Sequence, residues 1–285
     1  MDHRADHLGR RRLGDAAVTA VGFVGPGRMG RPMVDRLLQA GHEVTVLARR
    51  EEVRTGLERA GARALTTPSE AAKGAEVVLV CLFSDEQLLE VCEAGLLAAL
   101  EPGCVVASHV TGRRSTVQQL GARAAERGAR FVDAPVSGGV AEIEAGGLTV
   151  MLGGDEAAVS TVDAVIAAYA DPRIRTGALG SALAVKLVNN LLFATHAQTA
   201  AAAIQLGERL GVEQAALLQV LESASGRSFA GSSLGRAGSL STWADLVGEF
   251  MRKDVAACEA ELEAAGADGG LLVDVVRRGP LPLAR

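Results

Sequence analysis

A glycine-rich turn near the N-terminus constrains the fold more than any other feature of the chain. An apolar, β-prone run over residues 17–24 leads into the G-x-G-x-x-G turn Gly25-Pro26-Gly27-Arg28-Met29-Gly30, and apolar residues then recur at helical spacing as far as Leu38. A strand, a glycine turn and a helix in this order predict a dinucleotide-binding domain. The helix would offer unpaired N–H groups and the positive end of its dipole to the phosphates. A plain glycine-rich loop is the alternative, and the flanking pattern favours the binding turn.

Length and composition limit the classes to which the chain can belong. A chain of 285 residues exceeds the usual size of one domain, so two domains are expected. The net charge of −5 argues against a nucleic-acid-binding protein, and the apolar segments are too short for a membrane span. The four cysteines lack C-x-x-C spacing, which predicts reduced, mostly buried thiols in a cytoplasmic protein.

Strand and helix patterns alternate in the first part of the chain, which predicts an α/β fold with a Rossmann-type, doubly wound, mostly parallel sheet. Strands are expected at residues 43–47, 63–65, 76–82, 104–107, 130–132 and 148–152, and a helix from Asp155 to about residue 170. From Ser181 onward the pattern is helical, with helices expected at residues 181–210, 213–224, 243–265 and 271–278 and a Gly/Ser-rich loop at residues 226–241. The expected organisation is a disordered leader (residues 1–16), a dinucleotide-binding Rossmann domain (residues 17–180) and an all-α substrate and dimerisation domain (residues 181–285).

The end of the second expected strand bears on the choice of cofactor. NAD-binding Rossmann domains tend to carry Asp or Glu there, because the carboxylate accepts a hydrogen bond from the ribose 2′-hydroxyl. This chain has Ala48 followed by Arg49 and Arg50. Two guanidinium groups suit a 2′-phosphate. The sequence therefore favours NADP over NAD, and ordinary solvated loop charges are the alternative interpretation of the two arginines.

Ligands of open α/β sheets bind beyond the carboxyl ends of the strands. The strand at residues 76–82 therefore directs Leu82, Phe83 and Gln87 toward a ligand, although loop packing also explains Phe83. Another strand leads into the segment at residues 133–139, whose Ser-Gly-Gly end is expected to expose N–H groups that suit a carboxylate or phosphate. His109 is expected to be a hydrogen-bonded structural residue.

Lys186 interrupts an apolar face of the long expected helix, and Asn190 follows one turn later. Residues at positions i and i+4 point to the same side of a helix. Burying a lysine is costly unless it has partners or a lowered pKa. The pair is therefore either a catalytic site or a lysine that reaches solvent at a domain edge, and the pattern alone leaves both interpretations open.

Four motifs together resemble the β-hydroxyacid dehydrogenases, the group of 3-hydroxyisobutyrate dehydrogenase and tartronate semialdehyde reductase. They are the glycine turn at residues 25–30, the segment at residues 133–139, Gly177-Ala178-Leu179-Gly180-Ser181 with Lys186-Leu187-Val188-Asn189-Asn190 after it, and Lys253-Asp254. The resemblance implies a Rossmann domain followed by a helical domain through which two chains form a homodimer.

The resemblance also implies roles for individual residues. Lys186 would be the catalytic lysine, and Asn190 would help to hold the substrate. A small carboxylate substrate would bind at Ser137, Gly138 and Gly139. The residues expected from the pattern or from the resemblance to contact the cofactor are Gly25, Pro26, Gly27, Arg28, Met29, Gly30, Arg49, Arg50, Leu82, Phe83, Gln87, Thr111 and Lys253.

The chain also departs from the family pattern. Val110 replaces a hydroxyl residue that would touch substrate, Gly112-Arg113-Arg114 stands where a proline is usual, and Ala182 replaces a glycine before the long helix. The chain ends at Arg285, so the final helix of the family is expected to be missing. These departures leave the substrate open.

The sequence thus predicts an NADP(H)-dependent oxidoreductase that interconverts a small β-hydroxyacid and its semialdehyde by hydride transfer, with Lys186 as general acid and base. No metal site is expected. One alternative is an imine reductase on the same fold, against which Lys186 argues, because those enzymes commonly carry Asp or Tyr at this position. The other alternative is a non-catalytic NADP-binding protein.

Overall fold

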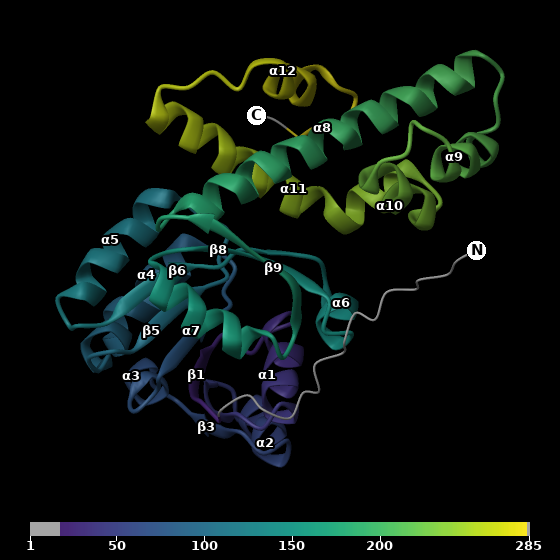
Figure 1. The fold of residues 1–285 in the computed structure, drawn as a ribbon. Helices are drawn as coiled ribbons and strands as arrows, with labels where there is room; N and C mark the ends of the chain where they lie inside the picture. The colour runs from purple at the N-terminus through teal and green to yellow at the C-terminus, as the bar shows by residue number, and fades with distance from the viewer. Residues whose placement is uncertain (1–17, 284–285) are drawn as a thin grey trace, which may run out of the picture.

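The computed structural model describes residues 18–283, and the leader expected at residues 1–16 lies outside them. An α/β part comes first, and a helical part follows it (Figure 1). The strands are β1 (Ala20–Val24), β2 (Glu43–Leu47), β3 (Arg63–Leu65), β4 (Val77–Val80), β5 (Val105–Ser108), β6 (Arg130–Asp133), β7 (Val136–Ser137), β8 (Leu148–Gly153) and β9 (Ala170–Gly177). The helices of this part are α1 (Gly30–Gln39), α2 (Glu51–Arg59), α3 (Pro68–Ala72), α4 (Asp85–Val91), α5 (Arg114–Ala125), α6 (Val140–Glu144) and α7 (Glu156–Ile166), with short helical turns η1 (Cys92–Leu96) and η2 (Leu97–Ala99) after α4.

The sheet has the order β3-β2-β1-β4-β5-β6-β8-β7, and β9 pairs with β8. Every pairing from β3 to β6 is parallel, whereas β8 runs antiparallel to β6 and β7 and parallel to β9. The predicted Rossmann-type, mostly parallel sheet is therefore confirmed. The chain leaves β1 toward β2 on one side and returns to β4 on the other, so the sheet order reverses between β1 and β4. Ligands of such sheets bind in the crevice at this reversal.

Apolar side chains cover both faces of the sheet. In β4, Val77 and Leu79 belong to one buried cluster, while Val78 and Val80 belong to another on the opposite face. This alternation follows from the two-residue period of a strand, and burial on both faces explains why β4 is a continuous apolar run. Packing on both faces thus stabilises the sheet, and the carboxyl ends of its strands remain available to form a site.

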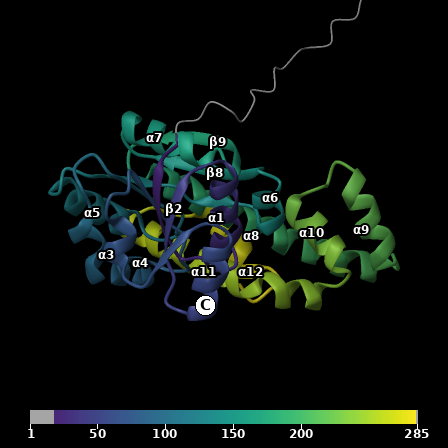
Figure 2. The same ribbon diagram turned by 90° about the horizontal axis from the view of Figure 1, so that it is seen from below.

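The helical part consists of α8 (Ser181–Arg209), α9 (Gln214–Ser223), α10 (Phe229–Ala237), α11 (Leu240–Ala265) and α12 (Gly270–Arg278). The long helix α8 leads away from the sheet, and α10, α11 and α12 pack against it (Figure 1). A view from below shows α9 at the outer end of the helical part, beyond α10 (Figure 2). Within residues 18–283, no helix combines the length and the apolar character that crossing a membrane requires.

Two local expectations are wrong. The loop expected at residues 226–241 contains α10, whose first turn is capped because the Ser228 hydroxyl accepts a hydrogen bond from the N–H of Gly231. Ala230 and Leu234, one turn apart, are the buried residues of this short helix. The helix expected to reach residue 170 ends at Ile166, and β9 begins at Ala170. Most residues of β9 are exposed, and Ile174 is its only large apolar residue, so its sequence carries no apolar alternation.

Candidate active site

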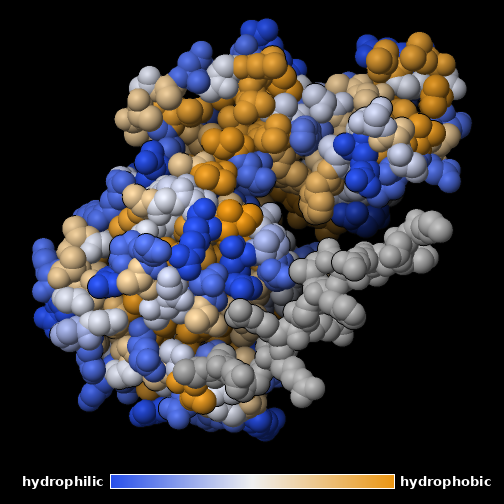
Figure 3. Space-filling view, viewed as in Figure 1, coloured by the Kyte–Doolittle hydropathy of each residue, from blue (hydrophilic) through white to orange (hydrophobic). Residues whose placement is uncertain are grey.

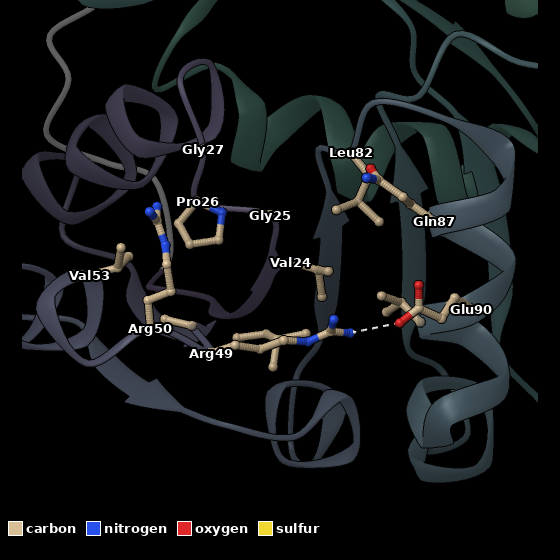
Figure 4. A pocket seen from close by; sticks show the side chains of 13 residues that line it. Val24, Gly25, Pro26, Gly27, Arg49, Arg50, Val53, Leu82, Gln87 and Glu90 are labelled. Atoms are coloured by element: carbon tan, nitrogen blue, oxygen red, sulfur yellow. Dashed lines mark hydrogen bonds and ion pairs between the residues drawn. The ribbon is translucent and has the colours of Figure 1, made fainter.

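A pocket of about 350 Å³ lies at the reversal of the sheet order, beyond the ends of β1, β2 and β4 (Figure 4). The glycine turn forms one wall, the segment after β2 a second, and the loop after β4 together with α4 a third. Seven residues that the sequence assigns to the cofactor line this pocket: Gly25, Pro26, Gly27, Arg49, Arg50, Leu82 and Gln87. The other described residues that line it are Val24, Leu47, Ala48, Val53, Glu90 and Val91.

The glycines of the turn meet different requirements. Gly25 has φ +90°, and a Cβ there would collide with the carbonyl oxygen of Cys81. A Cβ on Gly30 would collide with the carbonyl oxygen of Gly25. A Cβ on Gly27 would meet no protein atom within 4 Å, although Gly27 lines the pocket. Gly25 and Gly30 thus hold the turn together, whereas the space beside Gly27 fits the close approach of a pyrophosphate.

The remaining residues of the turn do not line the pocket. Gly30 is buried at the first position of α1, and Met29 precedes it as the N-cap residue. Arg28 is exposed. Thr111, which follows β5, is half-buried outside the pocket wall.

Both arginines after β2 lie on the pocket wall and pair with glutamates. The Arg49 Nη2 atom is 3.2 Å from Oε1 of Glu90 on α4 (Figure 4), and the Arg50 Nη1 atom is 3.6 Å from Oε1 of Glu52. All four side chains are more than 60% exposed, so each ion pair stabilises the fold weakly. The guanidinium groups can therefore exchange these partners for a bound anion.

The loop after β4 joins the pocket to the helical part. The Gln87 Oε1 atom accepts a hydrogen bond of 3.0 Å from the N–H of Phe83. The Phe83 ring meets Phe250 of α11 edge to face at 5.9 Å, and the Lys253 Nζ atom lies 4.6 Å from its centre. Phe83 therefore packs against α11. Lys253 lies beside Phe83, and the residue before Phe83, Leu82, lines the pocket.

Lys186 and Asn190 form a polar cluster with Asp254 on the facing helix α11. Lys186 is half-buried and Asn190 is buried, and the Asn190 Nδ2 atom donates a hydrogen bond of 2.9 Å to Oδ2 of Asp254. Burial lowers the pKa of Lys186, the Asp254 carboxylate opposes this change, and the Lys253 ammonium adds to it. Burial raises the pKa of Asp254, against the two ammonium groups. An amine in this setting can take up and release a proton more readily than an exposed lysine.

The segment at residues 133–139 differs from the expectation at its Ser-Gly-Gly end. Ser137 belongs to β7 and pairs with Thr149 of β8. The N–H of Gly139 is not free, because it donates a hydrogen bond of 2.7 Å to Oε2 of Glu142 in the first turn of α6. The structure brings Arg49 and Gln87 into one pocket with the glycine turn, but Ser137, Gly138 and Gly139 lie outside the pocket wall.

Asp133 has a role that the sequence reasoning missed. Its buried carboxylate accepts hydrogen bonds from the N–H groups of Gly180 at 2.7 Å and Leu183 at 2.8 Å. Burial raises the pKa of Asp133, and these donors oppose the change. The carboxylate thereby caps the N-terminus of α8, the helix that carries Lys186. The available signal was a carboxylate directly after the apolar pair Phe131-Val132 of a strand.

His109 is a structural residue, as predicted. Its Nδ1 atom lies 2.6 Å from the carbonyl oxygen of Ala134, and its Nε2 atom lies 2.8 Å from the Tyr169 hydroxyl. Burial lowers the pKa of His109 to about 4. The four cysteines are free, and all except the half-buried Cys81 are buried. No three His, Cys, Asp or Glu side chains within residues 18–283 are grouped to hold a metal ion.

Comparisons with known proteins agree with this arrangement. Residues 20–189 match the NAD binding domain of 6-phosphogluconate dehydrogenase, and residues 180–273 match the family described as NAD-binding of NADP-dependent 3-hydroxyisobutyrate dehydrogenase. The chain is 36% identical over 212 residues to L-threonate dehydrogenase of Cupriavidus necator, which covers 73% of this chain and 71% of that protein. It is 34% identical over 212 residues to NAD-dependent L-serine dehydrogenase of Pseudomonas aeruginosa, with 74% and 71% covered.

The fold comparison leads to the same group. The structure of Mycobacterium tuberculosis 3-hydroxyisobutyrate dehydrogenase with L-serine superposes with a TM-score of 0.81 at 28% identity, covering 92% of both chains. The two domain matches together span residues 20–273 and meet near the start of α8. The chain therefore belongs to the 3-hydroxyisobutyrate dehydrogenase-like family of NAD(P)-dependent hydroxyacid dehydrogenases.

Proposed function

We propose that this protein is an NADP(H)-dependent oxidoreductase that interconverts a small β-hydroxyacid and its semialdehyde. The observation that carries the proposal is the cluster of Lys186, Asn190 and Asp254 on two facing helices. Lys253 interacts with this cluster and also lies over Phe83, at the loop that helps to line the pocket. The cluster would therefore face the loop after β4, and a bound dinucleotide would lie beside that loop.

Lys186 would be the general acid and base. When bound, the nicotinamide cofactor supplies or accepts the hydride at the substrate carbon. In reduction, the Lys186 ammonium gives a proton to the carbonyl oxygen, and in oxidation the neutral amine takes that proton from the hydroxyl. Burial lowers the pKa of Lys186, which makes the neutral amine more accessible than in an exposed lysine. The ammonium also stabilises negative charge on the oxygen as it forms.

Asn190 would orient the substrate hydroxyl. Its Nδ2 group donates a hydrogen bond to Asp254, and this bond fixes the rotation of the amide. The Oδ1 atom accepts only a longer contact of 3.4 Å from the neighbouring Asn189 among the described residues. This oxygen can therefore accept a hydrogen bond from a hydroxyl group that approaches Lys186.

The substrate carboxylate would bind at Ser137, Gly138 and Gly139. Because Glu142 now occupies the N–H of Gly139, a substrate carboxylate would have to replace that side chain. One carboxylate would replace another as the acceptor of the Gly139 N–H. The hydrogen bond to the substrate would therefore compensate for the lost hydrogen bond to Glu142. Val110 is buried and cannot supply the hydroxyl that the family places beside its substrate.

NADP preference rests on the segment after β2. Arg49 and Arg50 lie on the pocket wall, and Ala48 offers no carboxylate there to a ribose 2′-hydroxyl. The helical part matches a family described as NADP-dependent, whereas one relative is named NAD-dependent, so relatives with both names exist. The space beside Gly27 would hold the pyrophosphate.

The deciding experiment replaces Lys186. In Lys186→Ala, NADPH binding measured by fluorescence titration should remain at the wild-type level, while turnover of a semialdehyde falls about 10²–10⁴-fold. Lys73→Ala, on the exposed end of α3, is the matched control and should keep full turnover. Turnover near wild type in Lys186→Ala would contradict the proposed role. A parallel panel of cyclic imines tests the imine reductase alternative, which predicts NADPH consumption with imines alone.

The assembly would be a homodimer formed through a helical domain that begins at Ser181. Val185, Val188 and Leu192 recur at i, i+3 and i+7 on α8 and are each more than 40% exposed. Figure 3 shows apolar side chains gathered over the helical part of this face. Such a stripe is typical of a surface that another chain covers. Val188→Asp should halve the molecular mass measured by light scattering, whereas Val220→Asp on α9 should not.

A further inference from the structure

The pocket contains a carboxylate that the sequence reasoning did not consider. Among the described residues that line it, Glu90 is the only acidic one. It comes from the last turn of α4, far along the chain from the segment after β2. Figure 4 shows its side chain directed across the pocket toward Arg49.

Glu90 and Arg49 are close enough to share any ligand of the guanidinium group. The Oε1 atom of Glu90 lies 3.2 Å from Nη2 of Arg49, and both side chains are 61% exposed. A group that Arg49 binds in this pocket therefore lies within a few ångströms of the Glu90 carboxylate. The two side chains are opposite in charge, so they favour opposite kinds of ligand.

We propose that Glu90 determines cofactor selectivity, as a carboxylate that competes with the 2′-phosphate of NADP for Arg49 and accepts a hydrogen bond from the 2′-hydroxyl of NAD. The proposal rests on the proposed function only in taking this pocket as the adenosine end of the dinucleotide site. Glu90 supplies from α4 the carboxylate that is missing after β2, where Ala48 stands. It thereby reduces the preference for NADP that Arg49 and Arg50 create.

The physical basis is a difference between two states of the pair. With NADP bound, Arg49 must leave Glu90 for the phosphate, and two negative groups then lie near each other. With NAD bound, the ion pair persists and the carboxylate keeps a free oxygen as an acceptor. Removing the charge of Glu90 therefore favours NADP and disfavours NAD.

The test measures cofactor affinity without substrate, by fluorescence titration of NADPH and NADH at one fixed ionic strength, since salt screens exposed charges. In Glu90→Gln, the ratio of NADPH to NADH affinity should rise about fivefold, the scale set by losing an exposed ion pair. Glu93→Gln is the matched control. Glu93 is an equally exposed glutamate in the next turn, and it pairs with Arg123 at 3.7 Å, outside the pocket.

An affinity ratio for Glu90→Gln that equals the ratio for Glu93→Gln, or that moves toward NADH, would overturn the proposal. Arg49→Ala separates this failure from a failure of the proposed function. If Arg49→Ala weakens NADPH binding alone, NADP preference holds whatever Glu90→Gln shows. If Arg49→Ala changes neither affinity, Arg49 does not bind the 2′-phosphate, so NADP preference fails and the competition proposed for Glu90 fails with it.

Discussion

The side-chain amide of Asn190 donates a 2.9 Å hydrogen bond to the carboxylate of Asp254, which joins α8 to α11. The same carboxylate opposes the lowering of the Lys186 pKa by burial. Asp254 thus orients one neighbour and stabilises the charged form of the other. A neutral side chain of the same shape would keep the first effect and lose the second.

Asp254→Asn should therefore change the pH dependence of the reaction. Burial already lowers the pKa of Lys186 from 10.5, and without the Asp254 charge this pKa should fall further. With Lys186 as the proposed general acid, reduction needs its ammonium form, so the rate of reduction should begin to decline at a lower pH than in the wild type. The measurement is kcat for reduction against pH at saturating NADPH. Glu249→Gln, an exposed site on α11, serves as the control. If kcat in Asp254→Asn declines at the same high pH as in the wild type, the charge effect is refuted.

A pair of glycine variants should separate binding from stability. In Gly27→Ala the new methyl group meets no protein atom, so the free energy of unfolding should stay within about 1 kcal/mol of the wild type. The methyl group fills the space beside the proposed pyrophosphate, and NADPH affinity should fall at least about tenfold. The measurements are denaturant unfolding and fluorescence titration.

Gly30→Ala should behave in the opposite way, because its methyl group would collide with the carbonyl oxygen of Gly25. We expect a loss of about 1–3 kcal/mol in the free energy of unfolding, the usual cost of overpacking. Wild-type NADPH affinity in Gly27→Ala would show that phosphates do not approach this turn.

The parts of the fold that local sequence determines were predictable, and those that depend on distant contacts were not. The glycine turn is readable because its strand, turn and helix are adjacent in sequence. Glu90 reaches Arg49 only through the order of strands in the sheet, which no local pattern reveals. β9 pairs with β8 although most of its residues are exposed and it lacks an apolar alternation, so its partner strand rather than its composition determines its structure.

The Ser-Gly-Gly segment shows that a local signal can also be overlooked. Glu142 stands three residues after Gly139, the spacing at which a side chain reaches back to the N-terminus of a helix. The sequence therefore already contained a carboxylate that could accept a hydrogen bond from the N–H of Gly139, the group predicted to be free. The family motif includes Asp254, but no local pattern predicts its hydrogen bond with Asn190. That bond depends on the packing of α8 on α11.

Asp133 should be important for both stability and catalysis, although it is not expected to touch the reacting atoms. Asp133→Ala leaves the N–H groups of Gly180 and Leu183 without their acceptor, which should cost about 2 kcal/mol or more. Because these groups start α8, the position of Lys186 should change as well. We expect kcat per folded molecule to fall, measured below the unfolding transition.

The control for Asp133 is another capping aspartate. Asp155 accepts from the N–H of Ala158 at the start of α7, away from α8. Asp155→Ala should lose about 1 kcal/mol of stability and keep its kcat. If both variants keep the wild-type kcat, Asp133 stabilises α8 without positioning Lys186 for its proposed role.

His109 should make the protein sensitive to mild acid. Burial lowers its pKa from 6.5 to about 4, so between these pH values the unfolded chain binds a proton that the native chain does not. The free energy of unfolding should therefore fall as the pH is lowered through this window, by up to about 3 kcal/mol from this group. Asp133 acts in the opposite direction, because its pKa is raised by burial. The contribution of His109 is thus visible only as a difference between variants.

The measurement is urea unfolding at several pH values between 6.5 and 4 for the wild type and His109→Gln. The variant should be less stable throughout, because Ala134 and Tyr169 lose a well-placed partner. Its stability should nevertheless decline less steeply with acid, since the titrating group is gone. Parallel curves for the wild type and His109→Gln would mean that His109 carries its proton in the native state.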